Sequence, residues 1–173
     1  MKTFSLRSIF LVFSFLSCIP TLPAGALSAE KQVVGWIENV YVFPGNFKIK
    51  AKMDTGAKSS SLHADQIYEF KRDGKKWVRF ELTNREAYTK TFEAMLIRTS
   101  KIKKHHTKSE KRQVVRLGVC LGTVYKEVEV NLVDRSNFNY KMLVGRNFLK
   151  GSFVVDSDQK FTVKQECRGA RNR

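Results

Sequence analysis

From Val33 onward the chain is a succession of short segments in which apolar and polar residues alternate. In the clearest segment, 47–53 (Phe-Lys-Ile-Lys-Ala-Lys-Met), every second residue is apolar. A period of two is typical of a β-strand that buries one face. Pro44-Gly45-Asn46 precedes this run and Asp73-Gly74 separates two later ones, and these residues favour tight turns. The pattern predicts an all-β domain.

The expected strands cover most of the chain after residue 32. They are 33–43, 47–53, 61–67 (a short strand or a helical turn), 68–70, 77–82, 91–98, 114–119, 124–133, and a closing pair 153–155 and 161–163 joined by a turn at 156–160. Only 146–150 has a short helical pattern. Segment 99–112 is basic and almost without apolar residues, so we expect a long hairpin tip or loop there. Without βαβ spacing, we expect a small closed or two-sheet β domain.

The first residues have the pattern of a secretory signal peptide. Lys2 and Arg7 supply positive charge, residues 9–19 are apolar, and Ala24-Gly25-Ala26 offers small residues for cleavage. The apolar run is shorter than the roughly 20 residues that a membrane-spanning helix needs. We therefore expect residues 1–26 to be removed.

The remaining residues, 27–173, are then one exported domain, periplasmic or secreted, without a transmembrane span. Phe15-Leu16-Ser17-Cys18 also resembles a lipoprotein box, which leaves a lipid anchor on Cys18 as an alternative. In an exported protein Cys120 and Cys167 could form a disulfide, and two buried free thiols are the other possibility.

The chain carries a large excess of positive charge. Lys and Arg number 32 against 16 Asp and Glu, a formal net charge of +16. Such a field favours anionic partners such as acidic peptides or anionic surfaces. Export argues against a nucleic-acid partner. The alternative is that the charge only solvates the domain.

Two motifs carry the candidate chemistry. Asp54-Thr55-Gly56-Ala57 follows the alternating run 47–53, which places a carboxylate at the end of a half-buried strand. Glycine at that point lets backbone and substrate approach closely. The second motif, Met142-Leu143-Val144-Gly145-Arg146-Asn147-Phe148-Leu149, has the pattern of a buried strand that turns into a short helix.

Together these motifs resemble the retropepsin-like aspartic peptidases, the superfamily that includes the retroviral proteases. The string from Lys52 to Ala64, with Trp77-Val78-Arg79-Phe80 and Asp134-Arg135, is similar to a bacterial branch labelled ATP-dependent zinc proteases and associated with glutamate-ligase systems. The resemblance implies a small closed β-barrel with one short helix near the C-terminus, and aspartic-type endopeptidase activity.

The resemblance also implies roles for single residues. Asp54 would be catalytic, and its second carboxylate would come from Asp54 of another copy in a twofold homodimer, because neither Asp134 nor Asp156 is followed by Thr-Gly. The active-site loop and substrate contacts would come from Thr55, Gly56, Ala57 and Lys58. Structural support of the site would come from Gly145, Arg146 and Asn147.

The sequence lacks the motifs that the family label would require for ATP binding and for zinc catalysis. Gly56-Ala57-Lys58-Ser59 is not a P-loop, because the upstream glycine is absent. No His-Glu-x-x-His occurs, and the three histidines are His63, His105 and His106. We therefore expect no nucleotide, metal or other cofactor, and we expect His63 to be a packed polar residue.

Two departures from the retroviral pattern affect the site. Lys58 stands where those enzymes have an acidic residue that pairs with the arginine of Gly-Arg-Asn. Arg146 therefore needs another partner, which could be a backbone carbonyl, Asp65 or Asp134, and Lys58 would favour an acidic substrate side chain. The glycine-rich flap is also absent, so either 91–115 covers the cleft or the flap is short and open.

The function expected is an exported, homodimeric aspartic endopeptidase that prefers acidic peptides. The alternative is a non-catalytic domain of the same fold that binds an anionic peptide or an envelope component. A third possibility, an intracellular enzyme that trims glutamate tails, conflicts with the signal peptide.

Overall fold

The computed structural model of the protein describes residues 30–104 and 107–167. The expected signal peptide, Cys18 and the pair His105-His106 lie outside the described residues. Within the described part, no helix is long and apolar enough to cross a membrane.

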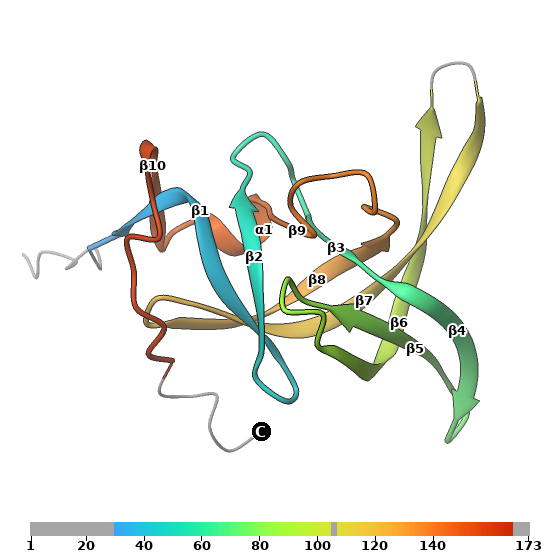
Figure 1. Cartoon of the computed structure of the whole chain (residues 1–173). Coiled ribbons are helices and arrows are strands. Elements are labelled where there is room, and N and C mark those ends of the chain that lie inside the picture. The colour runs from blue at the N-terminus through green and yellow to red at the C-terminus, as the bar shows by residue number, and fades with distance from the viewer. Residues whose placement is uncertain (1–29, 105–106, 168–173) are drawn as a thin grey trace, which may run out of the picture.

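Ten strands and one short helix make up the described chain (Figure 1). In order they are β1 (Gln32–Phe43), β2 (Phe47–Met53), β3 (Ser60–His63), β4 (Asp65–Arg72), β5 (Lys75–Thr83), β6 (Thr89–Lys104), β7 (Thr107–Leu121), β8 (Val124–Val133), β9 (Met142–Val144), α1 (Arg146–Leu149) and β10 (Phe153–Lys160). The prediction of an all-β chain with one short helix near its C-terminus is confirmed.

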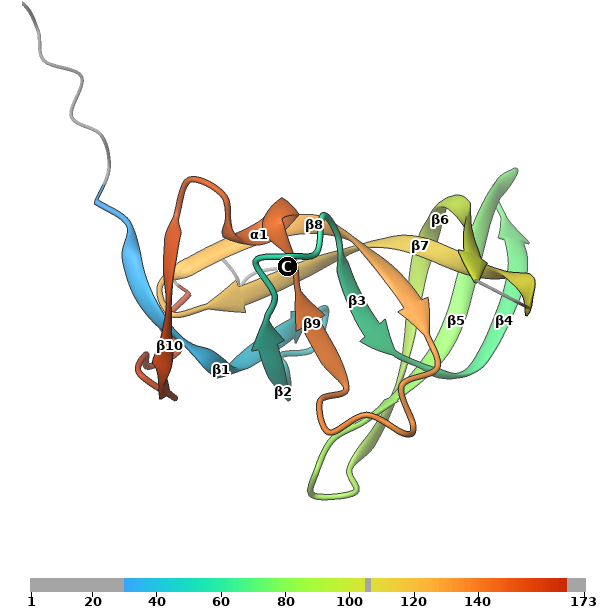
Figure 2. The same ribbon diagram turned by 90° about the horizontal axis from the view of Figure 1, so that it is seen from above.

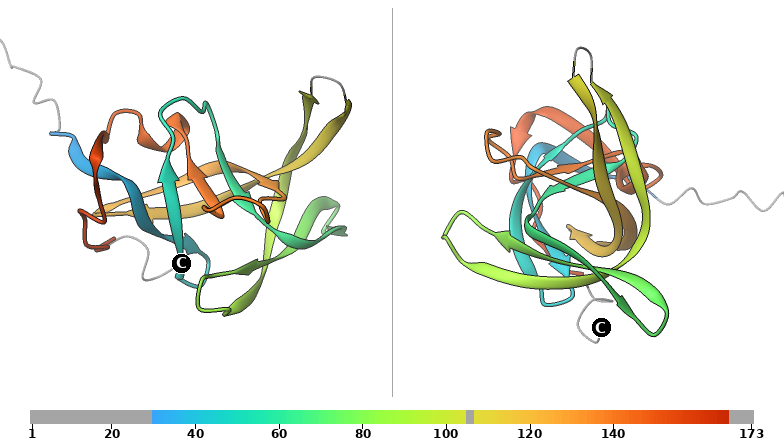
Figure 3. Two further views of the ribbon diagram at one scale, coloured as in Figure 1. Left: turned by 45° about the horizontal axis from the view of Figure 1, so that its top comes forward. Right: turned by 90° about the vertical axis from the view of Figure 1, so that its right-hand side faces the viewer.

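The sheet closes on itself to form a barrel. Its order is β10-β1-β2-β9-β3-β8-β7-β6-β5-β4, and β1 also pairs with β7, which closes a ring of six strands, β1-β2-β9-β3-β8-β7. β10 lies outside this ring along β1, while β6, β5 and β4 extend the sheet beyond β7. Figure 3 shows that extension as an arm that projects from the barrel.

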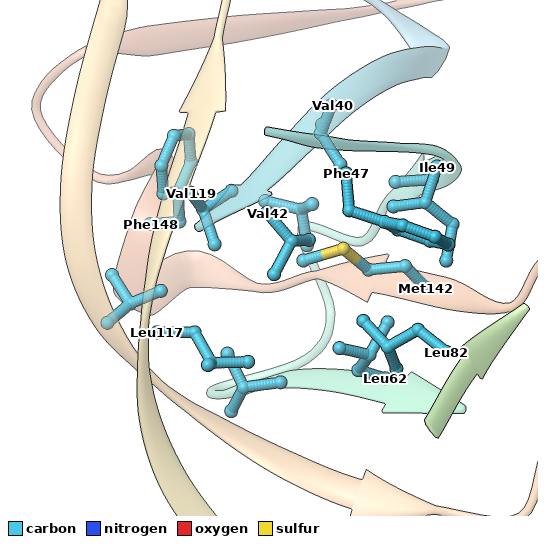
Figure 4. Close-up of a cluster of buried hydrophobic side chains, with 14 of the residues drawn as sticks. Val40, Val42, Phe47, Ile49, Leu62, Leu82, Leu117, Val119, Met142 and Phe148 are labelled. Atoms are coloured by element: carbon cyan, nitrogen blue, oxygen red, sulfur yellow. The ribbon is translucent and has the colours of Figure 1, made fainter. Parts of the chain in front are cut away.

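The alternating strands supply the barrel's core. In β2, Phe47, Ile49, Ala51 and Met53 are buried, whereas the lysines between them are exposed or half-buried. Figure 4 shows Phe47 and Ile49 in one cluster with side chains from β1, β7, β9 and α1. A fully buried aliphatic or aromatic side chain contributes about 1.5–3 kcal/mol. This packing fixes the end of β2, where Asp54 follows.

The closing pair of strands is predicted wrongly. Instead of two strands around a turn at 156–160, β10 is continuous and pairs in parallel with β1, with a shift in register between Gly35 and Ile37. Within this stretch Asp156 and Lys160 are in register with β1, and between them the Asp158 N–H donates to the Asp156 side chain at 2.9 Å. The side chains of residues 157–160 are exposed, so their composition resembles that of a turn. Gly35 permits the approach, since a Cβ there would lie 2.5 Å from the Gln159 carbonyl oxygen.

The basic segment 99–112 is a hairpin, as expected, but it is mostly strand. β6 continues to Lys104 and β7 begins at Thr107. The two strands pair from Leu96 opposite Val115 to Lys104 opposite Thr107. Strand pairing uses backbone groups, so it does not require the apolar side chains that a core needs. This hairpin and the loop after β2 extend to the same side of the barrel (Figures 1 and 3).

The C-terminal segment is fastened to the barrel at two points. Cys167 forms a disulfide with Cys120 of β7, with the two Cα atoms 6.0 Å apart, so the alternative of two free thiols is wrong. The fully buried Glu38 of β1 accepts hydrogen bonds from the backbone N–H and the hydroxyl of Thr162, both at 2.8 Å.

Candidate active site

Asp54 lies directly after β2, and the neighbouring strand positions it. β2 pairs in parallel with β9, and the Asp54 N–H donates to the Val144 carbonyl at 2.9 Å. Figure 2 shows β2, β9 and β3 side by side, with the loop after β2 at their end. A half-buried carboxylate is therefore held at the end of a buried strand, where the sequence places it.

The backbone of the following loop orients the Asp54 carboxylate. Its Oδ1 accepts hydrogen bonds from the N–H groups of Gly56 and Ala57, each at 3.1 Å. No hydrogen bond to Oδ2 occurs among the described residues, so that oxygen is available to water or substrate. Thr55, Gly56 and Lys58 are exposed and Ala57 is half-buried, so the loop presents a surface to solvent.

Arg146 supports the loop from behind. Its Nη1 donates to the carbonyls of Thr55 and Gly56, at 2.9 and 2.6 Å, and its backbone N–H donates to the Ala57 carbonyl at 2.9 Å. Of the partners considered for Arg146, the backbone carbonyls are therefore right. Asp65 instead lies beside His63, 3.2 Å from its Nε2.

Asn147 and Ser60 join the two motifs through a small polar network. The Asn147 amide oxygen accepts hydrogen bonds from the backbone N–H and hydroxyl of Ser60, at 3.0 and 2.9 Å. Ser60 Oγ in turn accepts from the N–H of Gly145 at 3.0 Å, and the Asn147 amide nitrogen donates to the Glu129 carbonyl at 2.8 Å. Ser60 is fully buried, so the network fixes α1 against the strand that leaves the loop.

Gly145 is required by close packing. A Cβ on this residue would lie 2.6 Å from the carbonyl carbon of Ser59 and 2.7 Å from its oxygen. The three Gly-Arg-Asn residues therefore contact the Asp54 loop and β3 through three different groups.

The loop of residues 134–141, between β8 and β9, brings an arginine to the site. Arg135 is only 9% exposed. Its Nε donates to the Tyr140 carbonyl at 2.9 Å, and its guanidinium lies 4.5 Å from the centre of the Phe138 ring. The backbone N–H of Arg135 donates to Nδ1 of the buried His63 at 2.8 Å, which holds the start of the loop on β3.

Two nearby charges act on the Arg135 guanidinium. Burial lowers the pKa of the Arg135 guanidinium, and the positive charge of Arg112 lowers that pKa further. The carboxylate of Asp54 acts in the opposite direction and raises the pKa.

Lys58 lies on the other flank of the loop. With Ser59 and Asn147 it lines a cavity of about 390 Å³ whose remaining walls come from β6, β7 and β8. Arg98 and Glu129 in these walls form an ion pair of 2.8 Å. Lys58 therefore contributes positive charge near the site from an exposed position. Among the described residues, no group of three metal-binding side chains comes together.

A closed β-barrel with Asp-Thr-Gly at a strand end and Gly-Arg-Asn packed behind it defines a retropepsin-like protein. The family model of the RimB-like proteins, described as retropepsin-like aspartic endopeptidase RimB, matches residues 33–166. The chain belongs to this family.

Curated relatives carry a different name. Proteins named probable alpha-L-glutamate ligase, from Shewanella pealeana and Shewanella halifaxensis, are 35% and 36% identical over 145 residues. Each match covers 81% of this chain but 31% of the relative, so the chain spans about a third of their length.

A solved structure has the same fold. A Legionella pneumophila protein of unknown function (DUF785) is 33% identical and superposes with a TM-score of 0.69. The match covers 78% of this chain and 100% of that one.

The structure adds three residues to the predicted site: Ser60, Asn131 and Arg135. Asn131 donates from its amide to the Ser60 carbonyl at 3.0 Å. Ser60 stands in a run of three serines, and nothing in the sequence distinguishes it, the fully buried one, from Ser59 and Ser61. Arg135 follows a strand as many surface arginines do, so its burial could not be recognised without the loop's conformation.

Proposed function

We propose that this protein is an exported aspartic endopeptidase that works as a homodimer on acidic peptides. The observation that carries the proposal is the Asp54 loop, in which one carboxylate oxygen is fixed by two backbone N–H groups and the other is open. This arrangement suits a carboxylate that must hold a water molecule in a defined position.

The proposed chemistry needs two such carboxylates. Two carboxylates a few ångströms apart share one proton, because both cannot be ionised at that separation. The ionised one removes a proton from water, which attacks the peptide carbonyl. The protonated one donates to the developing oxyanion, and the amine leaves after it takes up a proton.

The second carboxylate would come from a second copy. Asp134 lies on the loop between β8 and β9 and accepts a hydrogen bond from the Ser136 N–H at 2.8 Å, and Asp156 lies on β10. Asp134 also follows a strand directly, but neither Asp134 nor Asp156 has the Gly two positions later that Asp54 has. The exposed Thr55 would bond across the twofold axis to its counterpart, Gly56 would contact the substrate backbone, and Ala57 would line the cleft.

Two further features support the preference for acidic substrates and the export. The chain carries a net charge of +16, Lys58 directly follows Ala57 of the Asp54 loop, and Arg135 lies on the loop that leads into β9. The Cys120–Cys167 disulfide suits an oxidising compartment outside the cytoplasm.

The test compares the mature protein with Asp54→Asn on a mixed peptide library between pH 4 and 8. This change keeps the shape of the side chain and removes the shared proton. We expect cleavage to fall about 10²- to 10⁴-fold. Equal cleavage by both proteins would contradict the assignment of Asp54.

A second candidate is a non-catalytic binding domain. In the curated relatives named as ligases, the region similar to this chain makes up about a third of the protein. A binding module within a larger enzyme would have such a position. Binding of an acidic peptide by folded wild-type protein, without cleavage at any pH and unchanged in Asp54→Asn, would favour this candidate.

A further inference from the structure

Arg135 is anchored in a way that leaves part of its guanidinium unused. Nε donates to the Tyr140 carbonyl, the Phe138 ring covers one face, and His63 accepts from the backbone N–H. Within residues 30–104 and 107–167, no hydrogen bond uses its two terminal nitrogens, and no ion pair within 4.0 Å includes it. The side chain is therefore held in place with one hydrogen-bonding edge available.

The charge on this edge is poorly compensated. Arg135 is almost buried, and Arg112 adds a second positive charge in its surroundings, while Asp54 supplies the opposing negative charge. A buried cation without a close anionic partner is unfavourable, and an anion that comes into contact with it relieves that cost. A planar guanidinium suits a carboxylate best, because two parallel N–H groups can bond both oxygens.

We propose that Arg135 binds a substrate carboxylate beside the scissile bond and so determines the preference for an acidic residue there. The proposal rests on the proposed function, because it assigns a specificity residue to the same site. Arg135 lies on the loop that leads into β9, and the Val144 carbonyl of β9 accepts a hydrogen bond from the Asp54 N–H. The bound carboxylate would therefore belong to a residue near the bond that the water held by Asp54 attacks. His63 and Tyr140 act as positioning residues, since they hold the loop and the guanidinium.

Lys58 is less suited to this role. It is exposed, and it lines a cavity that already contains the acidic residues Glu127 and Glu129. An ammonium on a flexible stem in water attracts anions generally but holds none in a defined geometry. Arg135 is buried and anchored, so it can distinguish a carboxylate from its amide analogue.

The experiment uses two fluorescent peptides of the same length. In one Glu alternates with Ala, and in the other Gln replaces every Glu. Cleavage is measured for the mature wild type, Arg135→Gln and Arg135→Lys. Binding is measured by anisotropy in an Asp54→Asn background, with and without Arg135→Gln. Lys75→Gln, at an exposed position at the start of β5, is the matched control for loss of one positive charge.

We expect Arg135→Gln to raise KM and Kd for the Glu peptide about 10- to 100-fold and to leave the Gln peptide unaffected. Arg135→Lys should recover part of the preference, and Lys75→Gln should match the wild type. If folded Arg135→Gln prefers the Glu peptide as strongly as the wild type does, the proposal is wrong. Should Arg135→Gln not fold, the same result with Arg135→Lys overturns the proposal.

The two proposals fail in different ways. If no protein cleaves but the Asp54→Asn background binds the Glu peptide through Arg135, the peptidase assignment fails and the carboxylate site stands. If cleavage depends on Asp54 but the preference does not depend on Arg135, the peptidase stands and the carboxylate site is overturned.

Discussion

At Gly145 the backbone of α1 comes so close to residues 59 and 60 that no side chain fits. We expect Gly145→Ala to lower the free energy of unfolding by about 1–3 kcal/mol, because the added methyl must displace backbone rather than a flexible side chain. Urea unfolding of the purified variant measures this difference.

Gly56→Ala is the matched control. A Cβ at Gly56 meets only Asp54 Oδ1, at 3.3 Å. We expect it to change the free energy of unfolding by less than about 0.5 kcal/mol. Equal losses in the two variants would show that the close approach at Gly145 is not what makes glycine necessary there.

Ser60 is the other residue on which the site depends locally. Its hydroxyl donates to Asn147 and accepts from Gly145 in a buried position. Ser60→Ala leaves the Gly145 N–H without its acceptor, so we expect a loss of about 1–3 kcal/mol in unfolding free energy. Ser59→Ala, one position earlier and partly exposed, should be close to neutral in the same urea titration.

At the scale of elements, ion pairs hold the arm formed by β4, β5 and β6. Glu93 of β6 accepts from Arg72 of β4 and Arg79 of β5, and these hydrogen bonds lower the pKa of the Glu93 carboxyl. A carboxylate with a lowered pKa stabilises the fold above its ordinary pKa, here 4.5, and this contribution is lost as pH falls through the lower native value.

We therefore expect the Tm difference between wild type and Glu93→Gln to be largest near neutral pH and to vanish in acid. The effect should be small and should weaken in salt, because the groups are near the surface. Thermal melts from pH 7 to 2 measure it, with Glu86→Gln in the exposed turn after β5 as control. A Tm difference that grows in acid would contradict the assigned direction.

The disulfide fastens the C-terminal segment to β7 across 47 residues. Closing a loop of this length restricts the unfolded chain, so we expect Cys167→Ser to cost about 2–4 kcal/mol in unfolding free energy. The wild type under reducing conditions should approach the variant in urea titration, and the variant itself should not respond to reductant.

At the scale of the whole molecule, the described chain holds one Asp54 loop, so the proposed peptidase needs two copies. We expect specific activity to fall on dilution as dimers dissociate. Excess Asp54→Asn protein should inhibit the wild type at fixed concentration, because mixed dimers would contain one competent aspartate. Activity that is linear in concentration and insensitive to the variant would point to a site within one copy.

The sequence alone determined the features that depend on neighbouring residues. Alternation in 47–53 predicted β2 and its buried face, Asp73-Gly74 predicted a hairpin, and Asp54 was placed at a strand end. Gly145-Arg146-Asn147 was recognised as the companion motif. The strand, the hairpin and the position of Asp54 follow from a period of two, from turn chemistry and from short-range backbone geometry. The companion motif is recognised by its resemblance to the retropepsin-like family.

Only the tertiary structure decided what depends on partners distant along the chain. Residues 156–160 form a strand because β1 lies beside them, and Cys120 and Cys167 bond because two remote segments meet. Arg135 becomes a buried cation near Asp54 because His63 and Tyr140 hold its loop. Polarity in the sequence predicts exposure on average, whereas burial of a polar side chain is set by which strands the barrel brings together.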